Sequence, residues 1–272
     1  MNYNAIVELV FRARTIAKNA TLRSRIDMKG DADFVTAVDT EISDFIKKGL
    51  AEIAPGIAFV TEEEREHDNA PERFILDPID GTANLVRDYR KSSISLGHYK
   101  NGEVLFGVVF DPFTSEMFFA VKGKGAHYYN ARSGVAGLLR TGVENYTKHP
   151  LRVSNLPHTK AIVEFGAGST NKAVAAESFA LGQEIFENCQ DLRRICSSAL
   201  AICYIAAGRT DGYFERKIKP WDYAAGLLIL NEAGGLISQW NGEELPFNAP
   251  STIVAGNADT YAYLLSVLRN RQ

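Results

Sequence analysis

Asp77-Pro78-Ile79-Asp80-Gly81-Thr82 is the most informative segment of this chain, and it follows a short apolar run. The proline fixes its own φ and biases Asp77 toward an extended conformation, while Gly81 permits a tight bend. We therefore expect a short rigid turn after a buried strand, on which Asp77 and Asp80 face one point. Thr82 is a good N-cap, and the free N–H groups at such a helix start favour a bound phosphate. Two carboxylates beside an anion-binding turn indicate a metal and phosphate site.

The acidic residues around this segment suit Mg²⁺, because carboxylates are hard oxygen ligands and no histidine or thiolate pattern indicates zinc. A plain Asp-Pro turn with Asp80 as a solvated cap fits the segment as well. Glu62 and Glu63 follow the preceding apolar strand, and they either extend the acidic site or belong to a solvated loop. Asp222 precedes an apolar helix, and it either joins the site or caps that helix.

Helical and extended segments alternate along the chain without a low-complexity linker or an internal repeat. Apolar residues at helical spacing predict helices over residues 3–19 and 39–54, and residues 33–39 fit a turn and a helix cap. Residues 93–129 alternate in hydrophobicity between glycine-rich turns, so we expect a β-meander there. The elements predicted after residue 150 are strands 161–165, 192–195, 212–215, 235–240 and 252–255 and helices 172–186, 198–207, 221–233 and 259–270. The pattern predicts a layered α/β protein.

Composition restricts the function classes. The 272 residues allow two lobes, which we place at residues 1–146 and 147–272, and 46% hydrophobic with 23% charged residues exclude a disordered or fibrous chain. The net charge of −3 provides no global positive field, so we expect neither nucleic acid nor a membrane as a main partner. No segment has the length of a membrane span or the pattern of a secretory signal, which predicts a cytoplasmic protein. Cys189, Cys196 and Cys203 have no C-x-x-C pair and are expected to be reduced core thiols.

Four ordered motifs together resemble the inositol monophosphatase family of Mg²⁺-dependent, lithium-sensitive sugar phosphatases. They are D-x-V-T-x-x-D at residues 33–39, the acidic pair Glu62-Glu63, D-P-I-D-G-T at 77–82 and W-D-x-A-A-G at 221–226. The resemblance covers nearly the whole chain. It implies a mixed α/β fold, a five-layered αβαβα sandwich, in which the first lobe carries most metal ligands. It also implies a homodimer.

The resemblance implies two to three Mg²⁺ ions and a set of ligands for them. One ion would be held by Glu62, Asp77 and the Ile79 carbonyl. A second would be held by Asp77, Asp80 and Asp222. The carboxylates would thus come from three separate parts of the chain.

The resemblance also assigns roles in catalysis and substrate binding. Thr82, with Glu62, would orient the nucleophilic water, and Lys29 and Asp39 would lie just behind. The residues implied to contact the substrate are Asp80, Gly81, Thr82, Ser197, Ser198, Glu215 and Asp222. For Glu215 and the two serines, a strand-end charge and a helix cap are the structural alternatives.

The chain departs from the family pattern at two places and adds an unusual basic pair. Thr61 and Cys196 stand where the family commonly has glycine, and either change could alter the geometry of a loop. Arg216 and Lys217 are more basic than a neutral polyol pocket requires. They either contact a second phosphate or form a solvated surface pair.

Other catalytic patterns lack essential residues. Residues 166–172 partly match the P-loop motif but lack its second glycine and its Ser/Thr. Residues 31–41 contain spaced acidic residues but lack the central glycine of an EF-hand loop. The five histidines form no H-E-x-x-H motif, and no G-x-S-x-G elbow exists.

The sequence therefore predicts a phosphomonoesterase in which metal-activated water attacks inositol monophosphate or a related polyol or sugar phosphate in line. One alternative is a fructose-1,6-bisphosphatase or a 3′-phosphonucleotide phosphatase, for which Arg216 and Lys217 are the motivation. D-G-T-A-N at residues 80–84 is more similar to the monophosphatase motif. Another alternative is a regulatory binding protein whose active site is vestigial.

Overall fold

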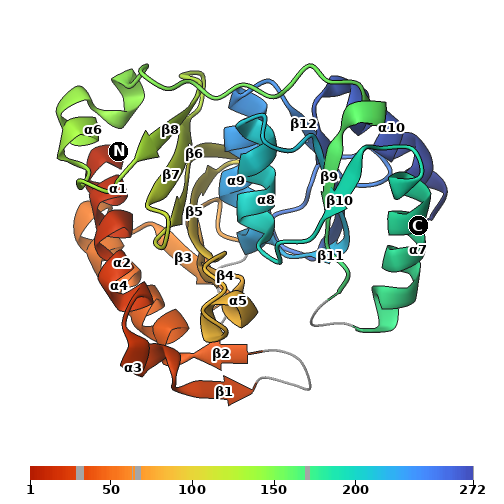
Figure 1. The fold of residues 1–272 in the computed structure, drawn as a ribbon. Helices are drawn as coiled ribbons and strands as arrows, with labels where there is room; N and C mark the ends of the chain where they lie inside the picture. Colours follow the sequence, from red (N-terminus) through yellow and green to blue (C-terminus); the bar gives the residue numbers. More distant parts are fainter. Residues whose placement is uncertain (29–33, 63, 65–68, 169–171, 272) are drawn as a thin grey trace.

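The computed structural model describes residues 1–28, 34–62, 64, 69–168 and 172–271, and two sheets with helices make up the molecule (Figure 1). The six-stranded sheet has the order β3 (Ala58–Thr61), β4 (Glu72–Asp80), β5 (Ser93–Lys100), β6 (Glu103–Asp111), β7 (Glu116–Val121) and β8 (Ala126–Asn130). The five-stranded sheet has the order β10 (Asp191–Arg193), β9 (Ile162–Phe165), β11 (Gly212–Ile218), β13 (Ser251–Gly256) and β12 (Leu236–Ser238). Both sheets mix parallel and antiparallel neighbours.

The helices form three layers around these two sheets (Figure 1). Outside the six-stranded sheet lie α1 (Tyr3–Arg12), α2 (Arg14–Ala17) and α4 (Ala37–Ile53). Between the sheets lie α8 (Ser198–Ala206) and α9 (Pro220–Glu232), and outside the five-stranded sheet lie α7 (Ala175–Phe186) and α10 (Ala258–Leu268). This arrangement confirms the predicted five-layered αβαβα sandwich.

The remaining elements are short. They are the antiparallel ribbon of β1 (Ile26–Met28) and β2 (Phe34–Thr36), the helices α3 (Ala20–Arg23), α5 (Thr82–Val86) and α6 (Ala136–Thr141), and the 3-10 turns η1 (Val143–Asn145), η2 (His158–Lys160), η3 (Lys172–Val174) and η4 (Arg269–Arg271). Two sequence-based expectations are corrected near the N-terminus. The helix predicted over residues 3–19 ends at Arg12 and resumes as α2, and the turn predicted over residues 33–39 contains β2.

Apolar residues pack into three main clusters that match the layers. The first lies between α1, α4 and the six-stranded sheet, and the third lies under α7 and α10. The second surrounds α8 and α9 and joins residues of β6 and β7 to residues of β11 and β13. Core residues from both sides of the predicted boundary at 146/147 therefore pack together, and the division into two lobes stays a prediction.

Small residues let α9 approach the six-stranded sheet closely. In the W-D-x-A-A-G motif, Ala225 lies over Gly107 of β6, and a Cβ added to Gly107 would come within 2.6 Å of the Ala225 carbonyl oxygen. Gly97 of β5 faces Ala224 in the same way, with a distance of 3.2 Å from its added Cβ to the Ala224 Cβ. The motif's alanines are thus explained by helix-on-sheet packing. Its aspartate, Asp222, accepts a hydrogen bond of 2.9 Å from the Lys219 N–H and so helps to cap α9.

Gly107→Ala should lower the free energy of unfolding by about 1–3 kcal/mol, since the methyl group would push α9 off the sheet. Urea denaturation measures this. Gly182→Ala in α7 is the matched control, because its added Cβ would meet neighbours at an ordinary 3.6 Å and alanine favours a helix. Equal stability of the two variants would contradict the close-packing account.

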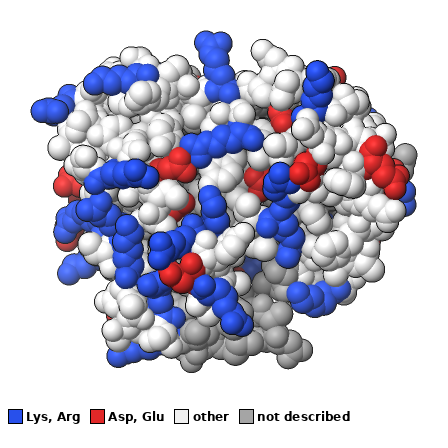
Figure 2. Space-filling view, viewed as in Figure 1, with Lys and Arg blue, Asp and Glu red and all other residues white. Residues whose placement is uncertain are grey.

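The surface carries charges of both signs. On the face seen in Figure 2, Lys and Arg side chains are more widespread than Asp and Glu side chains, although the net charge of the whole chain is −3. Among the described helices, none combines the length and the apolar character that crossing a membrane requires.

Candidate active site

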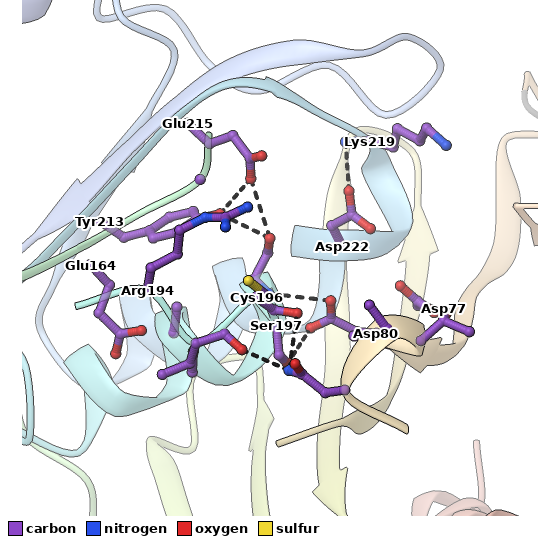
Figure 3. Close-up of a pocket in the computed structure, with 18 of the residues that line it drawn as sticks. Asp77, Asp80, Glu164, Arg194, Cys196, Ser197, Tyr213, Glu215, Lys219 and Asp222 are labelled. Carbon is purple, nitrogen blue, oxygen red and sulfur yellow. Dashed lines mark hydrogen bonds between the residues drawn. The ribbon is translucent and has the colours of Figure 1, made fainter. Parts of the chain in front are cut away.

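Three carboxylates meet where β4 ends and α9 begins. Asp77 and Asp80 lie in the last four residues of strand β4, and Asp222 lies in the first turn of α9. Each offers an oxygen atom, and these oxygen atoms lie within 4.8 Å of one another (Figure 3). Asp77 and Asp80 are buried, while Asp222 is partly exposed. Residues 145 positions apart in the sequence therefore form one acidic cluster.

A β-bulge explains how Asp77 and Asp80 come to face the same side. Residues three positions apart on a regular strand point to opposite faces of the sheet. Here Asp77 pairs with Ser95 and Asp80 pairs with Ser93, so three steps on β4 oppose two on β5. The extra residue rotates the strand and turns Asp80 toward Asp77. The expectation of a rigid turn after Asp77 is therefore wrong, because the strand β4 continues to Asp80. The expectation that the two carboxylates converge is confirmed.

Burial makes the ionised cluster costly without a cation. It raises the pKa of Asp77 and of Asp222 well above the usual range, and the neighbouring negative charges raise both further. Burial also raises the pKa of Asp80 to about 6, against the opposing effect of its hydrogen bonds. An all-oxygen donor set of this kind fits a hard divalent cation such as Mg²⁺.

Glu62 lies beside this cluster but outside the group of three. Its Oε1 atom accepts a hydrogen bond of 2.6 Å from the Lys219 Nζ, and both residues line the same cavity as the aspartates. Glu62 is close enough to contribute to the raised pKa of Asp77. The other members predicted for this region, Glu63, Lys29 and Asp33, lie outside the described residues.

Thr82 and Asp39 lie together behind the cluster. The Thr82 Oγ1 is 3.1 Å from the Ile79 carbonyl oxygen and 3.4 Å from Asp39 Oδ1, so its one hydrogen can be donated to either. Asp39 Oδ2 accepts from the Thr36 backbone N–H at 2.9 Å, which caps α4. Thr82 itself is not an N-cap, since Gly81, with a φ of +89°, occupies that position before α5.

Asp80 joins the acidic cluster to the start of α8. Its Oδ2 atom accepts hydrogen bonds from Ser197 Oγ at 2.6 Å and from the Ala199 N–H at 2.7 Å, and its Oδ1 atom accepts from the Ser198 N–H at 3.2 Å. A carboxylate here satisfies the unpaired N–H groups of the first helical turn and is stabilised by the helix dipole. Gly81 has no room for a side chain, because a Cβ would come within 2.9 Å of the Cys196 and Lys91 carbonyl oxygens.

A second polar group lies farther along the same cavity. Glu215 Oε2 accepts hydrogen bonds from Tyr213 at 2.5 Å and from Ser198 Oγ at 3.3 Å (Figure 3). Burial raises the pKa of Glu215 to about 7. Gly166 leaves space for this carboxylate, since a Cβ there would lie 2.0 Å from the Glu215 carboxyl carbon. Ser197 and Ser198 therefore divide their contacts between Asp80 and Glu215.

The cavity that joins both groups has a volume of about 320 Å³, the size of a site for a small metabolite. All the predicted catalytic, metal and substrate residues line it except Asp39. The lining residues that sequence analysis did not predict include Glu164, Lys172, Arg194, Tyr213 and Lys219. For Glu164 a signal existed, because a single charged residue interrupts the apolar strand Ile162–Phe165.

The model of the inositol monophosphatase family matches residues 2–272. The chain belongs to this family. An inositol-1-monophosphatase of Rhizobium meliloti (strain 1021) is 31% identical over 98% of this chain and 95% of that protein. A protein named Nus factor SuhB from Pasteurella multocida (strain Pm70) is 32% identical over 88% of this chain and 86% of its own length. The crystal structure of the extragenic suppressor protein suhB from Bartonella henselae superposes with a TM-score of 0.83 at 26% identity, covering 98% of each chain.

The two departures from the family pattern lie at turns next to the site. Thr61, the last residue of β3, is buried, and its Oγ1 accepts from the Glu64 N–H at 3.0 Å. Cys196 has a φ of +58°, in the left-handed region where glycine is favoured, so the backbone keeps a conformation suited to the family's glycine. The expectation that all three cysteines are core thiols is wrong for Cys196, which is exposed, and Cys189 is partly exposed.

The basic pair after Glu215 is Arg216 and Lys217, and successive side chains of a strand such as β11 point to opposite faces. Lys217 lines the cavity. Arg216 does not; it contacts Glu177 at 2.7 Å and lies over the Trp240 ring. Arg216 is therefore excluded as a contact for a second phosphate in this cavity, while Lys217 remains available.

Proposed function

We propose that this protein is a Mg²⁺-dependent phosphomonoesterase acting on a polyol or sugar phosphate such as inositol monophosphate. The observation that carries the proposal is the meeting of Asp77, Asp80 and Asp222 at one point of a cavity of metabolite size. Membership of the inositol monophosphatase family supports it. So does the similarity to a relative named inositol-1-monophosphatase.

In this proposal Asp77, Asp80 and Asp222 hold two to three Mg²⁺ ions, together with Glu62 and the Ile79 carbonyl oxygen. Mg²⁺, when bound, supplies positive charge to the phosphoryl group and lowers the pKa of water. Because Glu62 is paired with Lys219, cation binding would replace that ion pair.

The residues behind the cluster orient the nucleophile. If the Thr82 hydroxyl donates its hydrogen to Asp39 Oδ1, its oxygen is left to accept a hydrogen bond from water. Asp39 is itself held by the N-terminal turn of α4, so the direction of this chain of hydrogen bonds is set by the fold. At the other end, Ser198 and Glu215 would contact the hydroxyl groups of the alcohol.

Phosphate release from inositol 1-phosphate should require Mg²⁺. We expect EDTA to reduce release to the uncatalysed background and added Mg²⁺ to restore it, with inhibition by Li⁺. The assay measures inorganic phosphate across polyol, sugar and nucleotide phosphates. Release that persists in EDTA, or no release from any substrate with Mg²⁺, would contradict the proposal.

A binding role is the second candidate, because several relatives carry the name Nus factor SuhB rather than the name of an enzyme. Phosphate release that does not rise above the uncatalysed background in the presence of Mg²⁺ would favour the binding role. The homodimer, the cytoplasmic location and the lack of a nucleic-acid partner belong to the primary proposal as predictions. Sedimentation of the purified protein tests the dimer.

A further inference from the structure

Cations line the cavity, and one of them, Arg194, lies at the end away from Asp77 (Figure 3). Four basic residues line the whole cavity, and one of them, Lys219, is paired with Glu62. The other three are Lys172 in η3, Arg194 after β10 and Lys217 in β11. Among the described residues, none of these three has a hydrogen-bond or ion-pair partner.

Each of two basic pairs in the sequence places one cation in the cavity and one outside it. Arg193 forms an ion pair with Asp191, while its neighbour Arg194 lines the cavity. Arg216 forms an ion pair with Glu177, while its neighbour Lys217 lines the cavity. The cations outside are neutralised by carboxylates, and those inside are left for a ligand.

The acids at this end do not cancel the positive charge. Figure 3 shows Arg194 extending toward Tyr213 and Glu215, on the side of the pocket away from Asp77. Glu164 and Glu215 are the two acids here, and burial raises the pKa of each to about 7. Even when both acids are ionised, the three cations Lys172, Arg194 and Lys217 outnumber them.

We propose that Lys172, Arg194 and Lys217 bind a second anionic group of the substrate. The preferred substrates are then phosphate esters with a further phosphate or carboxylate at the far end of the molecule. This inference deepens the proposed function and rests on it for the scissile phosphate, which the acidic end would receive. The cavity of about 320 Å³ has room for a small sugar between the two ends.

Fructose 1-phosphate and fructose 1,6-bisphosphate provide a matched test, because they share the 1-phosphate ester and differ in the second phosphate. With Mg²⁺ we expect kcat/KM for the bisphosphate to exceed that for the monophosphate by at least about tenfold, the effect of one favourable charge interaction. Arg194→Ala and Lys217→Ala should each bring the ratio toward one. Arg193→Ala and Arg216→Ala, which remove the neighbouring cations outside the cavity, should leave the ratio unchanged.

A wild-type ratio of one or less would overturn the inference, and so would an equal loss of the ratio in the control variants. If neither these two compounds nor inositol 1-phosphate is hydrolysed, the proposed function fails, and titration calorimetry of both fructose phosphates with Mg²⁺ tests the anion site alone. Tighter binding of the bisphosphate that is lost in Arg194→Ala but kept in Arg193→Ala would support the site. Equal affinities for the two compounds would refute it.

Discussion

Asp80→Asn is expected to lower kcat for phosphate release by at least about 100-fold, in the range for loss of a key electrostatic group. Asparagine keeps the size of the side chain and one acceptor oxygen for the start of α8. It removes the charge that the proposed cation needs, at the centre of a cluster whose oxygen atoms lie within 4.8 Å of one another. Steady-state assays with inositol 1-phosphate measure the effect.

Two further measurements separate loss of the cation site from loss of the fold. Mg²⁺ should raise the Tm of the wild type, since a ligand that binds the folded state stabilises it, and this rise should shrink in the variant. Asp44→Asn, on the exposed face of α4, should preserve both the activity and the rise. Activity of Asp80→Asn within threefold of wild type would refute the role of Asp80.

Glu164→Gln is expected to make the protein less sensitive to pH. Glu164 is 2% exposed, its Oε2 atom has no hydrogen-bond partner, and burial raises its pKa to about 7. A raised pKa means that the folded state holds this proton more tightly than the unfolded state. The wild type should therefore lose stability as the pH rises from about 4.5 to about 7, by up to about 3 kcal/mol from this group. Glutamine is neutral throughout and avoids this loss.

Urea denaturation at pH 5 and pH 8 measures the difference between the two proteins. The free energy of unfolding of Glu164→Gln relative to wild type should be higher at pH 8 than at pH 5. Glu52→Gln, at an exposed position of α4, serves as the control and should show no such change. A constant difference at both pH values would mean that the charge on Glu164 does not oppose folding.

Much of the architecture could be predicted because it depends on local pattern. Helical periodicity predicted α4, and alternation with Asn-Gly and glycine-rich turns predicted the meander from β5 to β8. The carboxylates Asp77, Asp80 and Asp222 could be named as a group because they sit in short motifs similar to those of a known family. The bulge in β4 could not be predicted, since it is defined by the register against Ser93 and Ser95 on another strand.

The chemistry of the outer end of the cavity depended on contacts between distant residues. Sequence analysis treated Arg216 and Lys217 as one pair, and it overlooked Arg194 and Glu164. The position of the strand in the sheet decides which member of a basic pair faces the cavity. The other member is neutralised where a carboxylate lies opposite it, as Glu177 of α7 lies opposite Arg216.

The amino-acid sequence by itself determined the family, the order of the elements and the identity of the acidic cluster, because spacing within short motifs is a local property. The tertiary structure decided which charges are neutralised and which remain in the cavity. Glu62 meets Lys219 across 157 positions, and Asp80 meets Ser197 across 117. Burial and charge compensation depend on such long-range neighbours, and no short segment of the sequence contains both partners of either pair.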